Sequence, residues 1–491
     1  MIKFLVSKEM ALIKDRAFKF IYFLLLIFGT AFLDLSCPSH FIGGCCGTRT
    51  TGTGWHIDLV IHNGVIHTAR YNYDKMSVEY AYKSITENTW HIETVEKFPI
   101  EGASRRGRID YNRFLKIAVD DETVYIAYAG LEKTKVTDDI YDVDETSLKL
   151  ARREEDSKWY VMTITKPAIE SGYGYYYPLI IEELEVRGGN VYMKVSGLIY
   201  IIKKESEYMK ILTSGSGILN SELSDSELYI YVESATSKSV EVWRIDTDKE
   251  DKEKIFSYPV SLFSSYMLYF SDNTIYLTTV EKREMQYNLK LIRFDLVEVN
   301  SKEIFNYLLA QDKPKEFHDG PFIARPKLFR KSDGKIGVFL PYYFKVYVDG
   351  KRIDEITRQY RYYYYDYRFV YGVEDDNGWM ISEFPLGEIH KDSDIYYLGE
   401  DCREIPVILL ERFLEDHSRT YFGMAILNDS KLGVNWKEVK GEKIYSEIFD
   451  VSSPYVVLSF TSVDNSGWGE VRGTHMVYIF DGKSWKEEVV K

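Results

Sequence analysis

The chain has 491 residues, of which 45% are hydrophobic and 28% charged, and it contains 41 Tyr and 26 Phe. This composition is that of a globular protein and excludes a long low-complexity or disordered chain. The formal net charge of −14 repels phosphate backbones, so we expect no nucleic-acid partner. Aromatic residues fit a pleated, half-buried surface, and their abundance favours β-strands over helices.

An apolar run occupies residues 18–33 and follows the basic residues Lys14 and Arg16. Basic residues before a short apolar core are the layout of a secretory signal. The run is shorter than the roughly twenty residues that a permanent membrane helix needs. We therefore expect residues 1–36 to form a signal peptide or a hydrophobic anchoring helix and residues 37–55 a short linker. The chain would then be exported to the cell envelope or beyond it.

Two cysteines behind this run are candidates for lipid attachment. Cys37 lies at the usual distance from the apolar core, whereas Cys45 follows a better box of small residues, Ile42-Gly43-Gly44. Each resembles the bacterial lipoprotein signal and each departs from it. We predict a membrane-anchored protein, with lipid on Cys37 or Cys45 or with an uncleaved helix; free secretion and a buried cytosolic helix are the alternatives. Four cysteines are too few for a disulfide scaffold.

Beyond residue 55 the sequence predicts short strands separated by turns. Asn63-Gly64 is a strong hairpin signal, because both central positions of a type I′ turn need positive φ. Four strands within about forty residues are the size of one propeller blade. The first such block has strands at 58–62, 65–71, 77–82 and 90–95.

Residue types recur between blocks. Ser77–Ala81 matches Ser147–Ala151, Trp90 and Trp159 open equivalent strands, and Trp485 opens the final one. We expect one β-propeller over 56–491, because stacked blades cover each other's faces. Two β-sandwiches are the alternative, but the sequence has no linker near its middle. We predict eight blades, with seven or nine as alternatives, because the last three of nine block starts can merge into two: 56, 113, 178, 219, 263, 322, 363, 406 and 443.

The first, second and last blocks are similar to the repeats of the sialidase-like (BNR-type) propellers. The similarity lies in packing residues, such as Ala118-Val119-Asp120, Val124–Tyr128, Leu148–Ala151 and the strand that Trp159 opens. It implies a propeller fold and, as an alternative function, a glycan-processing enzyme of the sialidase or glycosidase type. The intact Asp-box of that family is absent.

No motif indicates catalysis or a metal site. The three convergent arginines of a sialidase cannot be recognised in one sequence, and Arg105–Arg108 is the only segment that suggests them. The acidic insertion at 138–145 offers oxygen ligands suited to Ca²⁺, but it lacks the glycine and the spacing of an EF-hand. We therefore predict no cofactor, leave any metal site unknown, and favour binding over enzymatic activity.

Two tyrosine clusters are the most distinctive local feature. In a strand, alternate residues point to opposite faces, so about half of each cluster must meet solvent or a partner unless blades pack on it. Exposed Tyr beside Arg is typical of binding surfaces. We predict an extracytoplasmic propeller that binds a protein or glycan partner through residues of these clusters: Tyr175, Tyr177, Arg361, Tyr363, Tyr365 and Arg368.

Overall fold

The fold is all-β throughout the part of the chain that the computed structural model describes. Residues 1–48 and several short internal segments lie outside that part. It covers 49–98, 115–135, 141–153, 157–165, 180–196, 198–203, 208–212, 216–219, 227–234, 238–246, 251–259, 265–271, 273–283, 286–309, 318–323, 326–330, 334–347, 363–376, 378–389, 393–400, 406–413, 420–428, 431–439, 443–452, 455–464, 470–481 and 483–491.

Neighbouring strands pair antiparallel in successive groups of four, which we number units 1 to 8. Units 1 to 4 are β1 (Arg49–His62), β2 (Val65–Asn72), β3 (Ser77–Ser84), β4 (His91–Lys97); β5 (Leu115–Asp120), β6 (Thr123–Lys135), β7 (Tyr141–Arg153), β8 (Trp159–Thr165); β9 (Ile181–Arg187), β10 (Asn190–Val195), β11 (Leu198–Ile202), β12 (Tyr208–Leu212); and β13 (Ser216–Leu219), β14 (Glu227–Ser234), β15 (Ser239–Asp246), β16 (Asp251–Pro259).

Units 5 to 8 follow the same plan, except that the first strand of unit 6 is divided into β21 and β22. Their strands are β17 (Ser265–Ser271), β18 (Thr274–Arg283), β19 (Gln286–Asp295), β20 (Asn300–Leu308); β21 (His318–Ile323), β22 (Lys327–Arg330), β23 (Ile336–Tyr347), β24 (Tyr363–Asp375), β25 (Gly378–Ile389); β26 (Ser393–Glu400), β27 (Pro406–Phe413), β28 (Thr420–Asn428), β29 (Lys431–Val439); and β30 (Lys443–Ser452), β31 (Tyr455–Asp464), β32 (Glu470–Phe480), β33 (Trp485–Val489).

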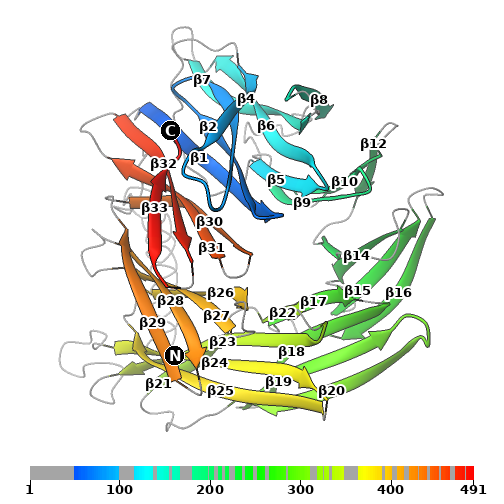
Figure 1. Cartoon of the computed structure of the whole chain (residues 1–491). Coiled ribbons are helices and arrows are strands. Elements are labelled where there is room, and N and C mark those ends of the chain that lie inside the picture. Colours follow the sequence, from blue (N-terminus) through cyan, green and yellow to red (C-terminus); the bar gives the residue numbers. More distant parts are fainter. Residues whose placement is uncertain are drawn as a thin grey trace, which may run out of the picture.

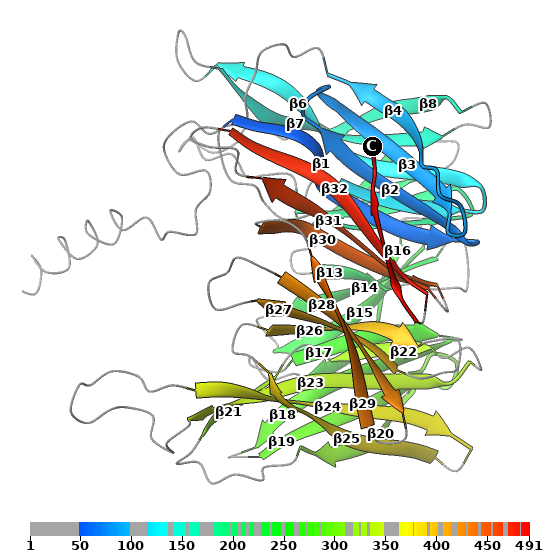
Figure 2. The ribbon, with the colours of Figure 1, turned by 60° about the vertical axis from the view of Figure 1, so that its left-hand side comes forward.

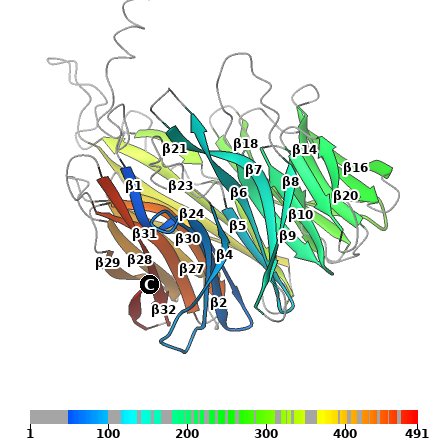
Figure 3. The same cartoon turned by 90° about the horizontal axis from the view of Figure 1, so that it is seen from above.

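The units follow one another clockwise in Figure 1 and stand side by side when seen from above (Figure 3), which is a propeller-like arrangement. The first strands of successive units contact each other, as β1 and β5, β5 and β9, and β26 and β30 do. Buried apolar clusters join units 1, 2 and 3, units 3 and 4, units 4 and 5, units 5 and 6, and units 8 and 1. Each sheet thereby buries apolar side chains against its neighbours, which a lone sheet could not do.

Unit 8 is joined to unit 1 through β1. The first residues of β1, Arg49–Gly52, pair in parallel with Glu470–Gly473 of β32, and the rest of β1 pairs with β2. Farther along, β33 pairs with Met476–Phe480 of β32. β1 and β32 run in the same direction side by side (Figure 2). The beginning of the described chain is therefore fixed to its last unit.

The structure confirms the strands expected in the first two blocks and at the C-terminus, and the hairpin residues Asn63 and Gly64 both have positive φ. In unit 6, β23 runs unbroken through Pro341. On its β21 and β22 side, β23 has no partners for Leu340 and Pro341, so the proline lies where the ladder on that side is interrupted.

The block start expected at 363 is wrong, because residue 363 begins β24. This strand takes the third position in the sheet of unit 6, after β21/β22 and β23, and does not start a new unit. The start expected at 406 is the second strand of unit 7. The three block starts expected at 363, 406 and 443 therefore correspond to two units, 7 and 8, and the described strands form eight four-stranded units. Within the described residues, no helix is long and apolar enough to cross a membrane.

Candidate functional site

A row of four nearly parallel rings crosses unit 1 at the end where β1 turns into β2. We call His67, Tyr80, Tyr82 and His91 the ring row. Ring centroids are 6.0 Å apart for His67 and Tyr80, 5.2 Å for Tyr80 and Tyr82, and 5.1 Å for Tyr82 and His91, with interplanar angles of 20°, 18° and 24°. His91 is exposed and Tyr82 half-buried, so the row opens to solvent at that end.

Local sequence explains why these rings meet. Tyr80 and Tyr82 are two residues apart in β3 and therefore share a face. Register places Tyr82 opposite His67 of β2 on one side and opposite His91 of β4 on the other. Cross-strand aromatic pairs stabilise a sheet, and here they extend over three strands.

Arg153 at the end of β7 lies over the ring row from unit 2. Its guanidinium carbon is 5.7 Å from the ring centroid of Tyr80 and 5.1 Å from that of Tyr82. Arg153 donates to both carboxylate oxygens of Glu93 in β4, from Nε at 3.0 Å and from Nη2 at 2.6 Å. Trp159 Nε1 also donates to Glu93, at 3.1 Å. The hydrogen bonds to Glu93 raise the pKa of Arg153, which is held charged against the rings.

Two members of the row, His67 and Tyr80, are neutral near pH 7. Burial, together with the neighbouring charges of His62 and Arg153, lowers the pKa of His67 to about 4. Burial also raises the pKa of Tyr80. The Tyr80 hydroxyl oxygen and Nδ1 of His67 are 2.6 Å apart, a hydrogen-bond distance. A neutral phenol and a neutral imidazole can orient a ligand, but a phenol with a raised pKa is a poor nucleophile.

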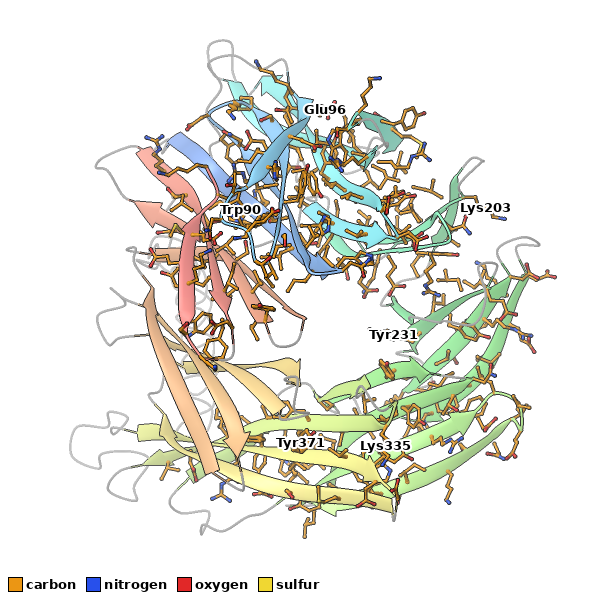
Figure 4. All side chains as sticks on the ribbon, in the orientation of Figure 1. Trp90, Glu96, Lys203, Tyr231, Lys335 and Tyr371 are labelled. Carbon is orange, nitrogen blue, oxygen red and sulfur yellow. The ribbon has the colours of Figure 1, made fainter. Side chains whose placement is uncertain are left out.

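The contact between units 8 and 1 repeats the arrangement around Glu93. Trp90, just before β4, donates from Nε1 to Glu488 of β33 at 2.9 Å, and Lys83 Nζ lies 2.7 Å from both Glu488 oxygens. Lys83 and Arg153 occupy matching positions after Ser77 and Ser147, and Figure 4 shows Trp90 beside β33. In both places a tryptophan and a cation from one unit bind a glutamate on the last strand of the preceding unit. These contacts join unit 8 to unit 1 and unit 1 to unit 2; we call each such contact between units a seam.

A cluster of buried polar side chains lies at the same contact between units 8 and 1. We call Arg70, Glu79, His475 and Ser459 the seam network; all four are at most 1% exposed. Arg70 donates to Glu79 and to the carbonyl of Val490, and its Nη1 is 3.3 Å from His475 Nδ1.

The hydrogen bonds of the seam network oppose a nucleophilic serine. Since Arg70 can only donate, Nδ1 of His475 accepts, and the proton of neutral His475 is on Nε2. Nε2 therefore donates to Ser459 Oγ, 2.6 Å away, whereas a general base would have to accept from it. Burial, together with the charge of Arg70, lowers the pKa of His475 well below its usual value. We assign the seam network to structure.

Of the residues predicted as a ligand site, Arg368 is buried within unit 6. It forms ion pairs with Asp366 at 3.2 Å and with Glu383 at 3.6 Å, and its guanidinium lies 5.4 Å from the Phe344 ring centroid. Tyr342 donates to Glu383 at 2.5 Å and is fully buried. A sialidase needs a tyrosine that substrate can reach beside several convergent arginines, whereas Tyr342 is fully buried and the pair that it forms with Glu383 contacts one arginine, Arg368.

The other predicted residues are described only in part. Tyr363 and Tyr365 are in β24, opposite Tyr347 and Lys345 of β23, and the structure describes their backbone alone. The remaining sites lie outside the described residues: Tyr175, Tyr177, Arg361, Cys37 and Cys45. Among described residues, no group of His, Cys, Asp or Glu is arranged to hold a metal ion.

No family model and no curated relative matches this chain. Among solved structures it is similar to dipeptidyl peptidase 4 of Porphyromonas gingivalis (TM-score 0.43, 11% identity, 90% of this chain and 60% of that one). It is also similar to an ulvan lyase (0.41, 9%, 91% and 97%) and to a prolyl endopeptidase (0.42, 11%, 89% and 55%). The chain spans a little over half the length of that endopeptidase. With such TM-scores, none of these similarities assigns an activity to this chain.

Proposed function

We propose that this chain is an exported, membrane-anchored β-propeller of eight blades that binds a carbohydrate through the ring row. The observation that supports a binding role is the fixed position of Arg153, which contacts the rings of Tyr80 and Tyr82 and is hydrogen-bonded to Glu93. Side chains that are ordered before the ligand arrives lose little entropy on binding.

We favour a carbohydrate over a protein surface as the ligand of the ring row. Sugar rings have an apolar face and a rim of hydroxyl groups, and the row offers the exposed ring of His91, stacked on the half-buried ring of Tyr82, with polar groups nearby. These are the imidazole nitrogens of His91, the carboxylate of Glu93 and the amide of Asn63, an exposed residue of the adjoining turn. A few polar groups at an aromatic surface are typical of small-ligand sites.

The test is direct binding of soluble oligosaccharides to the wild-type chain and to Tyr82→Ala. Calorimetry with oligomers of glucose, of N-acetylglucosamine and of a uronic acid covers neutral and acidic ligands. Removing one stacking ring should cost about 1–2 kcal/mol, or roughly 5- to 30-fold in affinity. Tyr287→Ala is the matched control, because Tyr287 of unit 5 is also half-buried beneath a cation, with Lys282 Nζ 5.4 Å from its centroid.

Each outcome separates the candidate functions. Binding that Tyr82→Ala weakens and Tyr287→Ala leaves unchanged supports the proposal. Binding that both variants retain would place the ligand elsewhere, and no binding to any oligomer would leave a protein partner as the better hypothesis. Cleavage of an oligomer would favour the alternative, a glycan-processing enzyme.

A further inference from the structure

The direction of the strands places the start of β1 and the ring row at opposite ends of unit 1. Arg49 begins β1, and the strand ends at His62, next to the turn at Asn63. The ring row is at the level of Val60, since Val60 pairs with His67, and His67 pairs with Tyr82. In Figure 2, β1 and β32 both begin on the left and run to the right.

From this arrangement we infer that the ring row faces away from the membrane and takes its carbohydrate from the external side. The inference rests on the proposed function, because it uses the membrane anchor and the ring row together. The structural support for the orientation is the parallel pairing of Arg49–Gly52 with β32. This pairing fixes the start of β1, which follows the proposed anchor, to the propeller.

The number of residues between the anchor and Arg49 limits which end of the propeller can face the bilayer. The 14 residues of β1 extend roughly 46 Å at a rise of about 3.3 Å each. Cys45 is four residues before Arg49 and Cys37 is twelve, so fully extended chains span about 14 Å and about 41 Å. A lipid on either cysteine therefore cannot reach past the end that carries Asn63, so in the lipid-anchored form of the protein that end cannot lie flat on the bilayer.

The partner must then come from outside the membrane that holds the anchor. A ligand of the ring row is a soluble saccharide or a polysaccharide that extends from another surface, rather than a lipid headgroup or a neighbouring membrane subunit. The exposed residues around the row agree with this, since His91 and Asn63 are polar.

Lysine labelling tests the orientation with the natural full-length chain. An amine-reactive reagent is applied to native membranes and to the same membranes dissolved in detergent, and labelling at each lysine is measured by mass spectrometry. Lys75, in the β2–β3 turn, and Lys97, at the end of β4, are exposed at the Arg49 end. Lys158, before β8, and Lys483, before β33, are exposed at the opposite end.

We expect labelling of Lys75 and Lys97 to be several-fold lower in membranes than in detergent, and labelling of Lys158 and Lys483 to be the same in both. Protection of Lys158 and Lys483, or equal labelling of all four, would overturn the inference. Sugar binding is measured on the detergent sample, so failure of the ring row as a binding site is seen independently of the orientation.

Discussion

Removing the carboxylate of Glu79 should destabilise the contact between units 8 and 1, which Arg70 makes through Val490 and His475. Glu79 is fully buried, and its Oε2 accepts from Nε and Nη2 of Arg70 at 3.1 and 2.8 Å. Burial alone would raise the pKa of Glu79, but hydrogen bonds from Lys75, Arg70 and Asn72 outweigh it and hold that pKa below its usual value. Glu79→Gln therefore leaves a buried guanidinium without its counter-charge.

Removing one partner of a buried ion pair costs about 3–5 kcal/mol. The matched control is Glu253→Gln, because Glu253 pairs with Arg244 at 2.5 Å while their side chains are 61% and 43% exposed. Exposed pairs contribute about 0.2–1 kcal/mol. The two substitutions change the same groups and differ in burial.

Urea unfolding and hydrogen exchange measure this difference. Large repeat proteins can unfold in steps, so exchange in β2 and β33 is followed beside the fluorescence midpoint. Glu79→Gln should lower the midpoint clearly and speed exchange in both strands, whereas Glu253→Gln should do neither. Equal, small effects of the two substitutions would refute the assignment of the seam network to stability.

Acid should weaken the fold through two histidines. The folded-state pKa values of His67 and His475 are lowered, chiefly by burial, so the unfolded chain binds protons first as pH falls below about 6.5. The free energy of unfolding should then decrease by at most about 1.4 kcal/mol per histidine for each pH unit below that value; a urea midpoint that is unchanged between pH 7 and 5 would contradict this. Gly130→Ala should cost about 1–3 kcal/mol, because a Cβ there meets Ser147 Oγ and lies 2.9 Å from Lys149 Cε. A urea midpoint within error of wild type would show that β6 and β7 accommodate the methyl group.

The strands of the first two units could be predicted from the sequence because their signals are local. The Asn63-Gly64 turn, the alternation in Ser77–Ser84 and the tryptophans that open outer strands each depend on a few neighbouring residues. The middle of the chain was predicted less well where a local rule was overridden. The block start expected at 363 is instead the third strand of unit 6, and its neighbour β23 continues through Pro341 where the strand on its other side is divided into β21 and β22.

The ring row was not predicted, because its rings come from three strands. The spacing of Tyr80 and Tyr82 in the sequence could have indicated a shared face. Only the register of both hairpins, including the irregularity between Val78 and Glu79, brings His67 and His91 beside them. The runs of adjacent tyrosines drew the prediction elsewhere, since clustering along the sequence is easier to see than proximity between strands.

The seam between the last and first units also has a consequence for the order of folding. Arg70 donates to the carbonyl of Val490, 420 residues away, and Lys83 binds Glu488 across 405 residues. During synthesis or export, both cations remain without these partners until almost the whole chain has emerged. Contacts so distant in sequence form slowly, because a long loop must close before they can stabilise anything. Completion of unit 1 is therefore a late step, and in a chain that loses its final residues Arg70 and Lys83 lack these partners at an open edge of unit 1.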